Sequence, residues 1–151
     1  VPVLPAETQQ RLMDFTPVAG TSVRNPVDTN VGWGPQGNKA IADTIRIVAE
    51  ADAIDIVLYH TGFGWGPTRG APDLVQMATE SARTLGDVMR ETRKPVVVVA
   101  RPPLASNGMD ATVAFHEEAA RQGMAVFPSV GRAATALARV LWAQELRAEA
   151  A

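Results

Sequence analysis

The chain has 151 residues, of which 46% are hydrophobic and 20% are charged, and its formal net charge is −2. A length near 150 residues indicates one domain with a core of its own. The weakly acidic charge argues against nucleic-acid binding through a broad basic surface, and no apolar run is long enough to cross a membrane. The chain has no cysteine, which excludes thiolate chemistry and cysteine-bound iron–sulfur clusters. It has only 2 histidines, which disfavours a histidine-rich metal site. We therefore expect a cytoplasmic protein without a resident metal.

Five stretches have the apolar spacing of helices, with about 3.6 residues per turn. They are Ala6–Phe15, the stretches that carry Ile41–Ala49 and Leu74–Met89, Val113–Arg121, and Gly131–Arg147. In the last helix we expect an N-cap at Ser129 and inward-facing residues at Ala133, Leu137, Val140 and Leu141. Gly123 is the expected left-handed C-cap of the preceding helix.

Short apolar runs separate these helices. Three are clear, Ile54–Tyr59, Pro95–Ala100 and Met124–Phe127, and a weaker one is expected at Val23–Asp28 or Val1–Leu4. Continuous apolar runs of this length are typical of parallel strands that are covered on both faces. Alternation of strands and helices implies right-handed crossovers. We therefore predict an α/β domain with a three-layer, flavodoxin-like or Rossmann-like parallel sheet.

Long loops rich in glycine and proline follow the predicted strands, at Thr29–Asn38, His60–Pro72 and Arg101–Asp110. Ligands of such sheets bind at the carboxyl ends of the strands, where these loops lie. Glycines let backbone amides turn toward an anion, and the following helix presents its positive N-terminus. We therefore expect an anion or phosphate site, and its candidate residues are Gly62, Gly64, Gly66, Arg69 and Arg101.

The tetrapeptide Gly-Trp-Gly-Pro occurs twice, at residues 32–35 and 64–67. One hypothesis is that the two indoles flank a single pocket. The alternative is that the glycines only form turns and the indoles cover the top of the sheet. The candidate pocket-lining residues are Asn25, Asp28, Gly32, Trp33, Gly34 and Trp65, although Asp28 also suits a purely structural turn.

Sequence motifs for phosphate binding and hydrolysis are absent. There is no Walker loop, and Pro67 stands where a dinucleotide fingerprint needs its last glycine, so a self-sufficient NTPase or dehydrogenase is disfavoured. Ser106 has no triad arrangement around it, and His116 is interpreted as a solvated helix residue. His60 is a candidate acid–base group, phosphate ligand or phosphoryl acceptor, with a capping or packing role as the alternative.

Several segments, in order, resemble the flavodoxin-like ligase domain of the NDP-forming acyl-CoA synthetases, the superfamily of succinyl-CoA synthetase and ADP-forming acetyl-CoA synthetase. They are the leading Leu4–Thr16, Arg24–Asp28 (RNPVD), Ile54–Leu58 (IDIVL), Lys94–Val99 (KPVVVV) and Gln122–Arg132 (QGMAVFPSVGR). The resemblance implies that acid, CoA and a nucleoside triphosphate give acyl-CoA, a nucleoside diphosphate and phosphate, through an acyl phosphate and a phosphohistidine. The loop of Gly62, Gly64 and Gly66 matches the family's loop that helps to hold the phosphohistidine phosphate.

The resemblance also implies what this chain lacks. Residues 1–151 correspond to one ligase domain of a longer enzyme, without the family's first glycine-rich strand, so either another chain pairs with the exposed sheet edge or the sheet rearranges. CoA and ATP or ADP then act through the whole enzyme, with its CoA-binding and ATP-grasp domains as partners, and a homodimer stays open. The isolated chain is expected to be inactive. The predominance of arginine over lysine indicates a bacterial source.

Two further points qualify this reading. His60-Thr61-Gly62 mimics the family's phosphohistidine motif, but that motif lies in a different domain, so we interpret the match as a coincidence. The alternative function is a non-catalytic, flavodoxin-like module that binds a nucleotide or anion or acts as a scaffold.

Overall fold

Three parallel strands and five helices make up the described part of the chain. The computed structural model describes residues 1–16, 21–29, 37–64, 73–103 and 106–150. Its elements are α1 (Ala6–Met13), α2 (Gly37–Glu50), β1 (Val57–Thr61), α3 (Leu74–Glu91), β2 (Val96–Ala100), α4 (Asn107–Arg121), β3 (Val126–Phe127) and α5 (Val130–Glu149). The strands form one parallel sheet in the order β1-β2-β3. The predicted α/β class, with a flavodoxin-like or Rossmann-like sheet, is therefore confirmed.

The sheet is apolar at its centre and open at one edge. β1 pairs with β2 from Val57↔Val96 to Thr61↔Ala100, and β2 pairs with β3 at Val98↔Val126. The central strand β2 is buried except for one half-buried valine, as the run of valines predicts. β1 instead alternates between buried or half-buried and exposed residues. Its exposed residues show that one face of the sheet is only partly covered.

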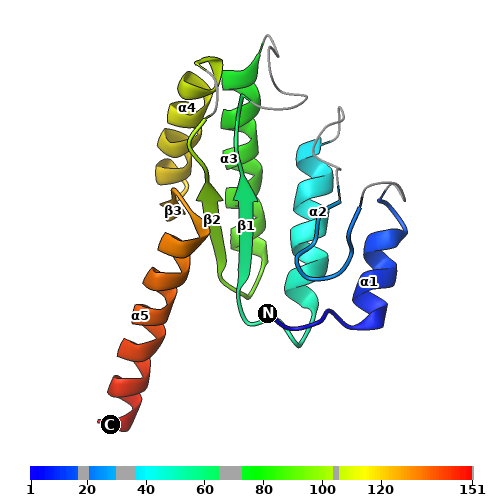
Figure 1. Ribbon diagram of the computed structural model, residues 1–151, viewed down its shortest axis with the longest axis vertical. Coiled ribbons are helices and arrows are strands. Elements are labelled where there is room, and N and C mark those ends of the chain that lie inside the picture. Colours follow the sequence, from blue (N-terminus) through cyan, green and yellow to red (C-terminus); the bar gives the residue numbers. More distant parts are fainter. Residues whose placement is uncertain (17–20, 30–36, 65–72, 104–105, 151) are drawn as a thin grey trace.

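Helices α3 and α4 lie side by side behind the sheet in Figure 1, α2 lies beside β1, and α1 lies on the far side of α2. The predicted stripes of α2 and α3 are confirmed, because their apolar residues join one core. That core contains Ile45 and Ala49 of α2, Leu74, Ala78, Ala82 and Leu85 of α3, and Phe115 and Ala119 of α4.

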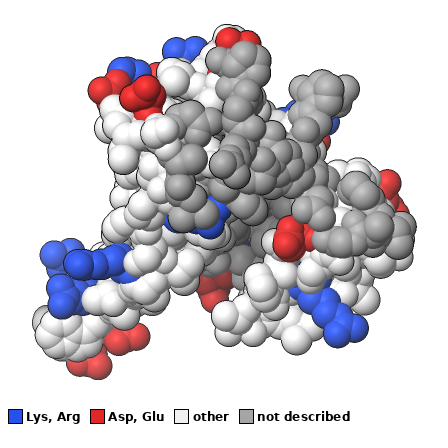
Figure 2. Space-filling view, turned by 45° about the horizontal axis from the view of Figure 1, so that its top comes forward, with Lys and Arg blue, Asp and Glu red and all other residues white. Residues whose placement is uncertain are grey.

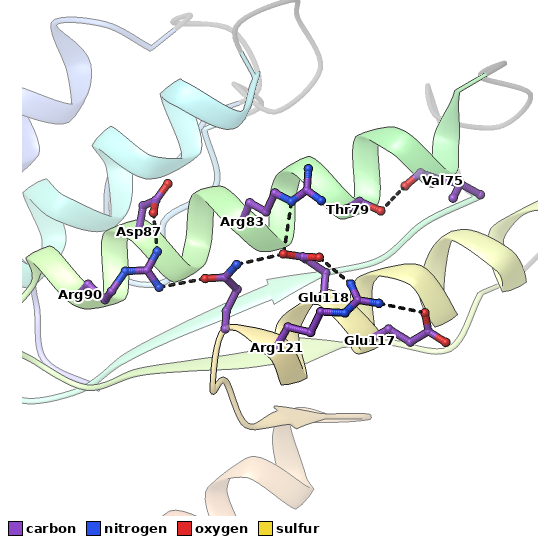
Figure 3. Close-up of polar contacts among 9 residues, drawn as sticks. Val75, Thr79, Arg83, Asp87, Arg90, Glu117, Glu118 and Arg121 are labelled. Atoms are coloured by element: carbon purple, nitrogen blue, oxygen red, sulfur yellow. Dashed lines mark hydrogen bonds and ion pairs between the residues drawn. The ribbon is translucent and has the colours of Figure 1, made fainter.

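A buried carboxylate connects α3 to α4 (Figure 3). The side chain of Glu118 is 5% exposed and accepts hydrogen bonds from Arg83 of α3 at 3.2 Å, from Arg121 at 2.6 Å and from Gln122 at 2.9 Å. Gln122 in turn accepts a hydrogen bond from Arg90 of α3 at 2.9 Å. The hydrogen bonds of Gln122, Arg121 and Arg83 hold the pKa of Glu118 below its ordinary value, against the opposite effect of burial.

The helix ends follow the sequence predictions at two positions. Gly123 has a φ of 75°, which is the left-handed conformation that glycine tolerates best. The amide of Gly123 donates to Ala120 and that of Met124 donates to Ala119, so α4 ends in a Schellman motif. Ser129 caps α5, since its hydroxyl accepts a hydrogen bond from the Arg132 amide at 3.3 Å.

Several predicted boundaries are wrong. Neither Val1–Leu4 nor Val23–Asp28 forms a strand, and an isolated antiparallel bridge joins Ser22 and Asp28 instead. The first strand begins at Val57 and continues through Thr61, because its register with β2 extends that far. α4 begins at Asn107, six residues earlier than predicted, so the end of the predicted third loop is helical.

Helix α5 differs most from the prediction. Of its expected inward residues only Ala133 is buried, while Val140 and Leu141 are 54% and 46% exposed. Trp142 is 62% exposed, and α5 extends away from the sheet in Figure 1. The apolar spacing predicts the helix, but most of this face has no cover within the described residues. No helix in these ranges is long and apolar enough to span a membrane.

Candidate functional site

A cavity of about 900 Å³ lies between β1, α2 and α3, and it reaches the carboxyl edge of the sheet. Five residues predicted from the sequence line it: Asn25, Asp28, His60, Gly62 and Arg101. In Figure 2, where the top of the molecule comes forward, one basic patch lies near the centre of the view and the other basic groups lie at the periphery. The structure thus brings residues from three separate segments to one cavity.

Strand register explains why Gly62 and Arg101 meet. Thr61 and Ala100 are partners at the ends of β1 and β2, and the Arg101 amide donates to the Thr61 carbonyl at 3.0 Å. The residues that follow each strand are therefore neighbours. A Cβ added to Gly62 would lie 2.6 Å from Nε and 2.7 Å from Cγ of Arg101. The Arg101 side chain consequently packs against the Gly62 backbone, and a side chain at position 62 would displace it.

The segment that follows β1 also packs against the helix that follows β2. Phe63 is buried, and its ring centroid lies 5.2 Å from that of Phe115 in α4. A Cβ on Gly108, in the first turn of α4, would lie 2.7 Å from the Phe63 carbonyl oxygen. Only glycine permits this approach of the helix to the loop backbone. Gly64 then takes a positive φ of 75°, which redirects the chain after Phe63.

Tyr59 lies along the same cavity, on the strand that leads to Gly62. Burial raises the pKa of its phenol above the ordinary value of 10.0, and a hydrogen bond with the Thr61 side chain opposes this increase. The phenol therefore keeps its proton at neutral pH and stays available as a donor. The sequence analysis did not single out this residue, although a tyrosine that ends an apolar strand is a recognisable signal.

The two histidines lie in different surroundings. His60 is exposed on β1 and lines the cavity, and its role as a phosphoryl acceptor or as a coincidental match stays a prediction. His116 is a half-buried residue of α4 that lies edge-on to Phe115, with ring centroids 6.3 Å apart, so it packs against the core while part of it meets solvent. Ser106 is exposed and forms no side-chain cap hydrogen bond with α4.

Other predicted site residues lie outside the described residues. They are Gly32, Trp33, Gly34, Trp65, Gly66 and Arg69. The hypothesis of a pocket between two indoles therefore stays a prediction. Among the residues that are described, no three His, Cys, Asp or Glu side chains gather where they could hold a metal ion.

Comparison with known proteins identifies the fold but not a family. No protein-family model matches the chain, and neither does any curated protein. Among solved structures, the crystal structure of PH0766 from Pyrococcus horikoshii OT3 is similar, with a TM-score of 0.57 and 19% sequence identity over 83% of this chain. The match covers 25% of that protein. At this identity the likeness shows a shared α/β fold, and this chain corresponds to about a quarter of the length of PH0766.

Proposed function

We propose that this chain is the phosphate-holding ligase module of an NDP-forming acyl-CoA synthetase. The observation that carries the proposal is the position of Gly62 and Arg101, which lie in contact at the carboxyl ends of two neighbouring parallel strands. This edge is where α/β sheets bind their ligands. The order of the sequence segments that resemble this enzyme family supports the same assignment.

The proposed chemistry uses a charge and backbone groups rather than a nucleophile of this chain. Amides of Gly62, Gly64 and Gly66, together with Arg69 and Arg101, would hold the phosphate while it passes between an acyl phosphate and a phosphohistidine. CoA and the nucleotide act through CoA-binding and ATP-grasp domains of the complete, cytoplasmic enzyme. We expect neither to bind this module tightly.

Phosphate binding by the 151-residue chain is the direct test. In a ¹H–¹⁵N NMR titration, inorganic phosphate is expected to shift the amide resonances of Gly62 and Gly64, and Arg101→Gln is expected to weaken the binding. Arg93→Gln is the matched control, because it removes the same charge near the start of β2, at the opposite end of the sheet. Equal binding by the two variants, or no phosphate shift at all, would refute the site.

A turnover assay tests whether the isolated chain is only one module of the enzyme. Acid, CoA and ATP are added to the isolated chain, and acid-dependent formation of acyl-CoA is measured. No product is expected, and sustained turnover would show that the chain is a complete enzyme.

The exposed apolar residues of α5 favour a second candidate, a scaffolding module that packs against other domains. Native mass spectrometry with phosphate, ADP and CoA separates the two. Retention of phosphate supports the ligase module, whereas retention of none of the three supports the scaffold.

A further inference from the structure

The free edge of β1 faces the cavity. β1 is the first strand of the sheet and pairs only with β2 among the described strands. The Val57 amide donates to the Pro95 carbonyl, and the Thr61 carbonyl accepts from the Arg101 amide, so the odd-numbered residues of β1 direct their backbone groups toward β2. Because these groups alternate sides along a strand, the amides and carbonyls of Leu58 and His60 point to the other side. Both residues line the cavity.

The remaining walls of the cavity are largely apolar. One face of α2 lines the cavity across from β1, and it carries Ile41, Ile45 and Val48. Helix α3 contributes Leu74 and Met77 to the same walls. A row of peptide groups between apolar walls needs a partner that supplies hydrogen bonds through its backbone and apolar contacts through its side chains. A hydrocarbon ligand would meet only the second requirement, whereas an extended peptide meets both.

Size and charge agree with such an occupant. At about 30 Å³ per molecule, a volume of 900 Å³ corresponds to roughly thirty waters, which is large for an apolar-walled cavity. Edge strands that stay unpaired are usually protected by lysine, proline or a bulge. β1 has the sequence VLYHT, without lysine, arginine, carboxylate or proline. An uncharged edge beside an uncharged helix face is complementary to an uncharged strand.

We propose that this cavity is a slot for an extended, uncharged segment of polypeptide, which adds to the sheet as a strand along the free edge of β1. The segment has β-branched or aromatic residues and pairs through the backbone groups of Leu58 and His60. The proposal does not depend on phosphate binding, because it concerns the backbone edge of β1 and the apolar face of α2.

Hydrogen exchange tests the pairing. The probe is the peptide PVVVVA, acetylated and amidated at its ends, which has the uncharged sequence of residues 95–100 and contains the strand that pairs with the other side of β1. At saturation, it is expected to slow amide exchange at Leu58 and His60 by about tenfold or more, and to change Val57 and Tyr59 less. The control peptide has proline in place of the second and fourth valines, at positions 97 and 99, so it lacks the amides that would pair with β1. It is expected to protect neither Leu58 nor His60.

A pair of variants isolates the backbone contribution. Leu58→Pro removes the amide that faces the slot and leaves the ladder to β2 intact, while Leu58→Ala removes the same side chain and keeps the amide. The probe is expected to bind Leu58→Pro roughly fivefold more weakly than Leu58→Ala, for the loss of one hydrogen bond. If the proline variant does not fold, the exchange measurement on the unaltered chain decides the question.

Three results would overturn the proposal. They are no protection of Leu58 and His60 by the probe, equal protection by the control peptide, and equal affinity of the two folded variants. Octanoate is the small-molecule control. Binding of octanoate without binding of the peptide would identify a ligand pocket and refute the strand slot, with no consequence for the phosphate site.

Discussion

Replacement of Gly62 by alanine is the sharpest perturbation of the proposed phosphate site. The added Cβ would lie 2.6 Å from Nε, 2.7 Å from Cγ and 3.1 Å from Cδ of Arg101. Van der Waals contacts between heavy atoms are optimal at about 3.5–4.0 Å, so the aliphatic part of the Arg101 side chain must move away by roughly 1 Å or change rotamer. Because Cγ lies near the backbone, movement of the guanidinium tip alone cannot relieve the overlap. The charge is therefore displaced from the carboxyl ends of β1 and β2.

The magnitude follows from the lost interaction. A hydrogen bond to a charged group contributes about 1.5–3 kcal/mol, which corresponds to roughly 10- to 150-fold weaker phosphate binding. Isothermal titration calorimetry of the 151-residue chain with inorganic phosphate measures this change. Gly131→Ala is the control, because a Cβ there meets no atom within 4 Å. If Gly62→Ala keeps the fold by circular dichroism and binds phosphate as well as the unaltered chain, the assignment of Arg101 to the site is wrong.

Three predictions concern the framework of the site. Phe115→Ala removes a fully buried ring that packs against Phe63 and is expected to lower the free energy of unfolding by about 3–5 kcal/mol in urea denaturation, whereas a loss below about 1 kcal/mol would contradict this packing. Ser129→Ala removes the cap of α5 and is expected to cost about 1 kcal/mol, measured in the same way, with Ser106→Ala as a neutral control. Glu118→Gln is expected to lower the melting temperature at neutral pH. Because the folded pKa of Glu118 is depressed, its stabilisation is present above the ordinary value of 4.5 and is lost as the pH falls through the folded value, so the two melting temperatures should converge in acid. A difference that stays constant down to acid pH would contradict the role of the charge.

Local patterns predicted the elements well where one stretch of sequence contained all the required information. The stripes of α2 and α3 and the valine run of β2 each record burial by periodicity alone. The caps at Gly123 and Ser129 are likewise local, because each satisfies backbone groups within four residues. The boundaries that failed depend instead on partners far along the chain.

Long-range contacts set these boundaries. β1 continues to Thr61 because β2 offers register partners for two residues beyond the apolar run. α4 begins at Asn107 although Gly108 disfavours a helix, and the glycine is required there by the approach to Phe63 rather than by helix propensity. The contact between Phe63 and Phe115 has no counterpart in any local spacing.

The candidate site was predictable only in part for the same reason. The rule that loops after parallel strands meet at one edge accounts for the contact between Gly62 and Arg101. Asn25 and Asp28 line the same cavity but follow no strand of the sheet, so this rule does not explain their position. It did not predict the apolar wall that α2 presents to that cavity. Helical periodicity identifies the residues that share a face, but the partner of that face is a property of the fold.

Helix α5 and the edge of β1 show the same limit in opposite ways. The apolar spacing of α5 is that of a packed helix, yet in the part of the chain that the structure describes Val140, Leu141 and Trp142 are exposed. The sequence of β1 is that of an interior strand, without the charge or proline that protects an edge, yet one side of it faces a cavity. The sequence pattern shows that a surface is suited to burial, because apolar area is unfavourable in water and peptide groups that are buried without hydrogen bonds carry a cost. For β1 the unpaired peptide groups narrow the choice to another strand, whereas for α5 the side chains alone specify no single partner.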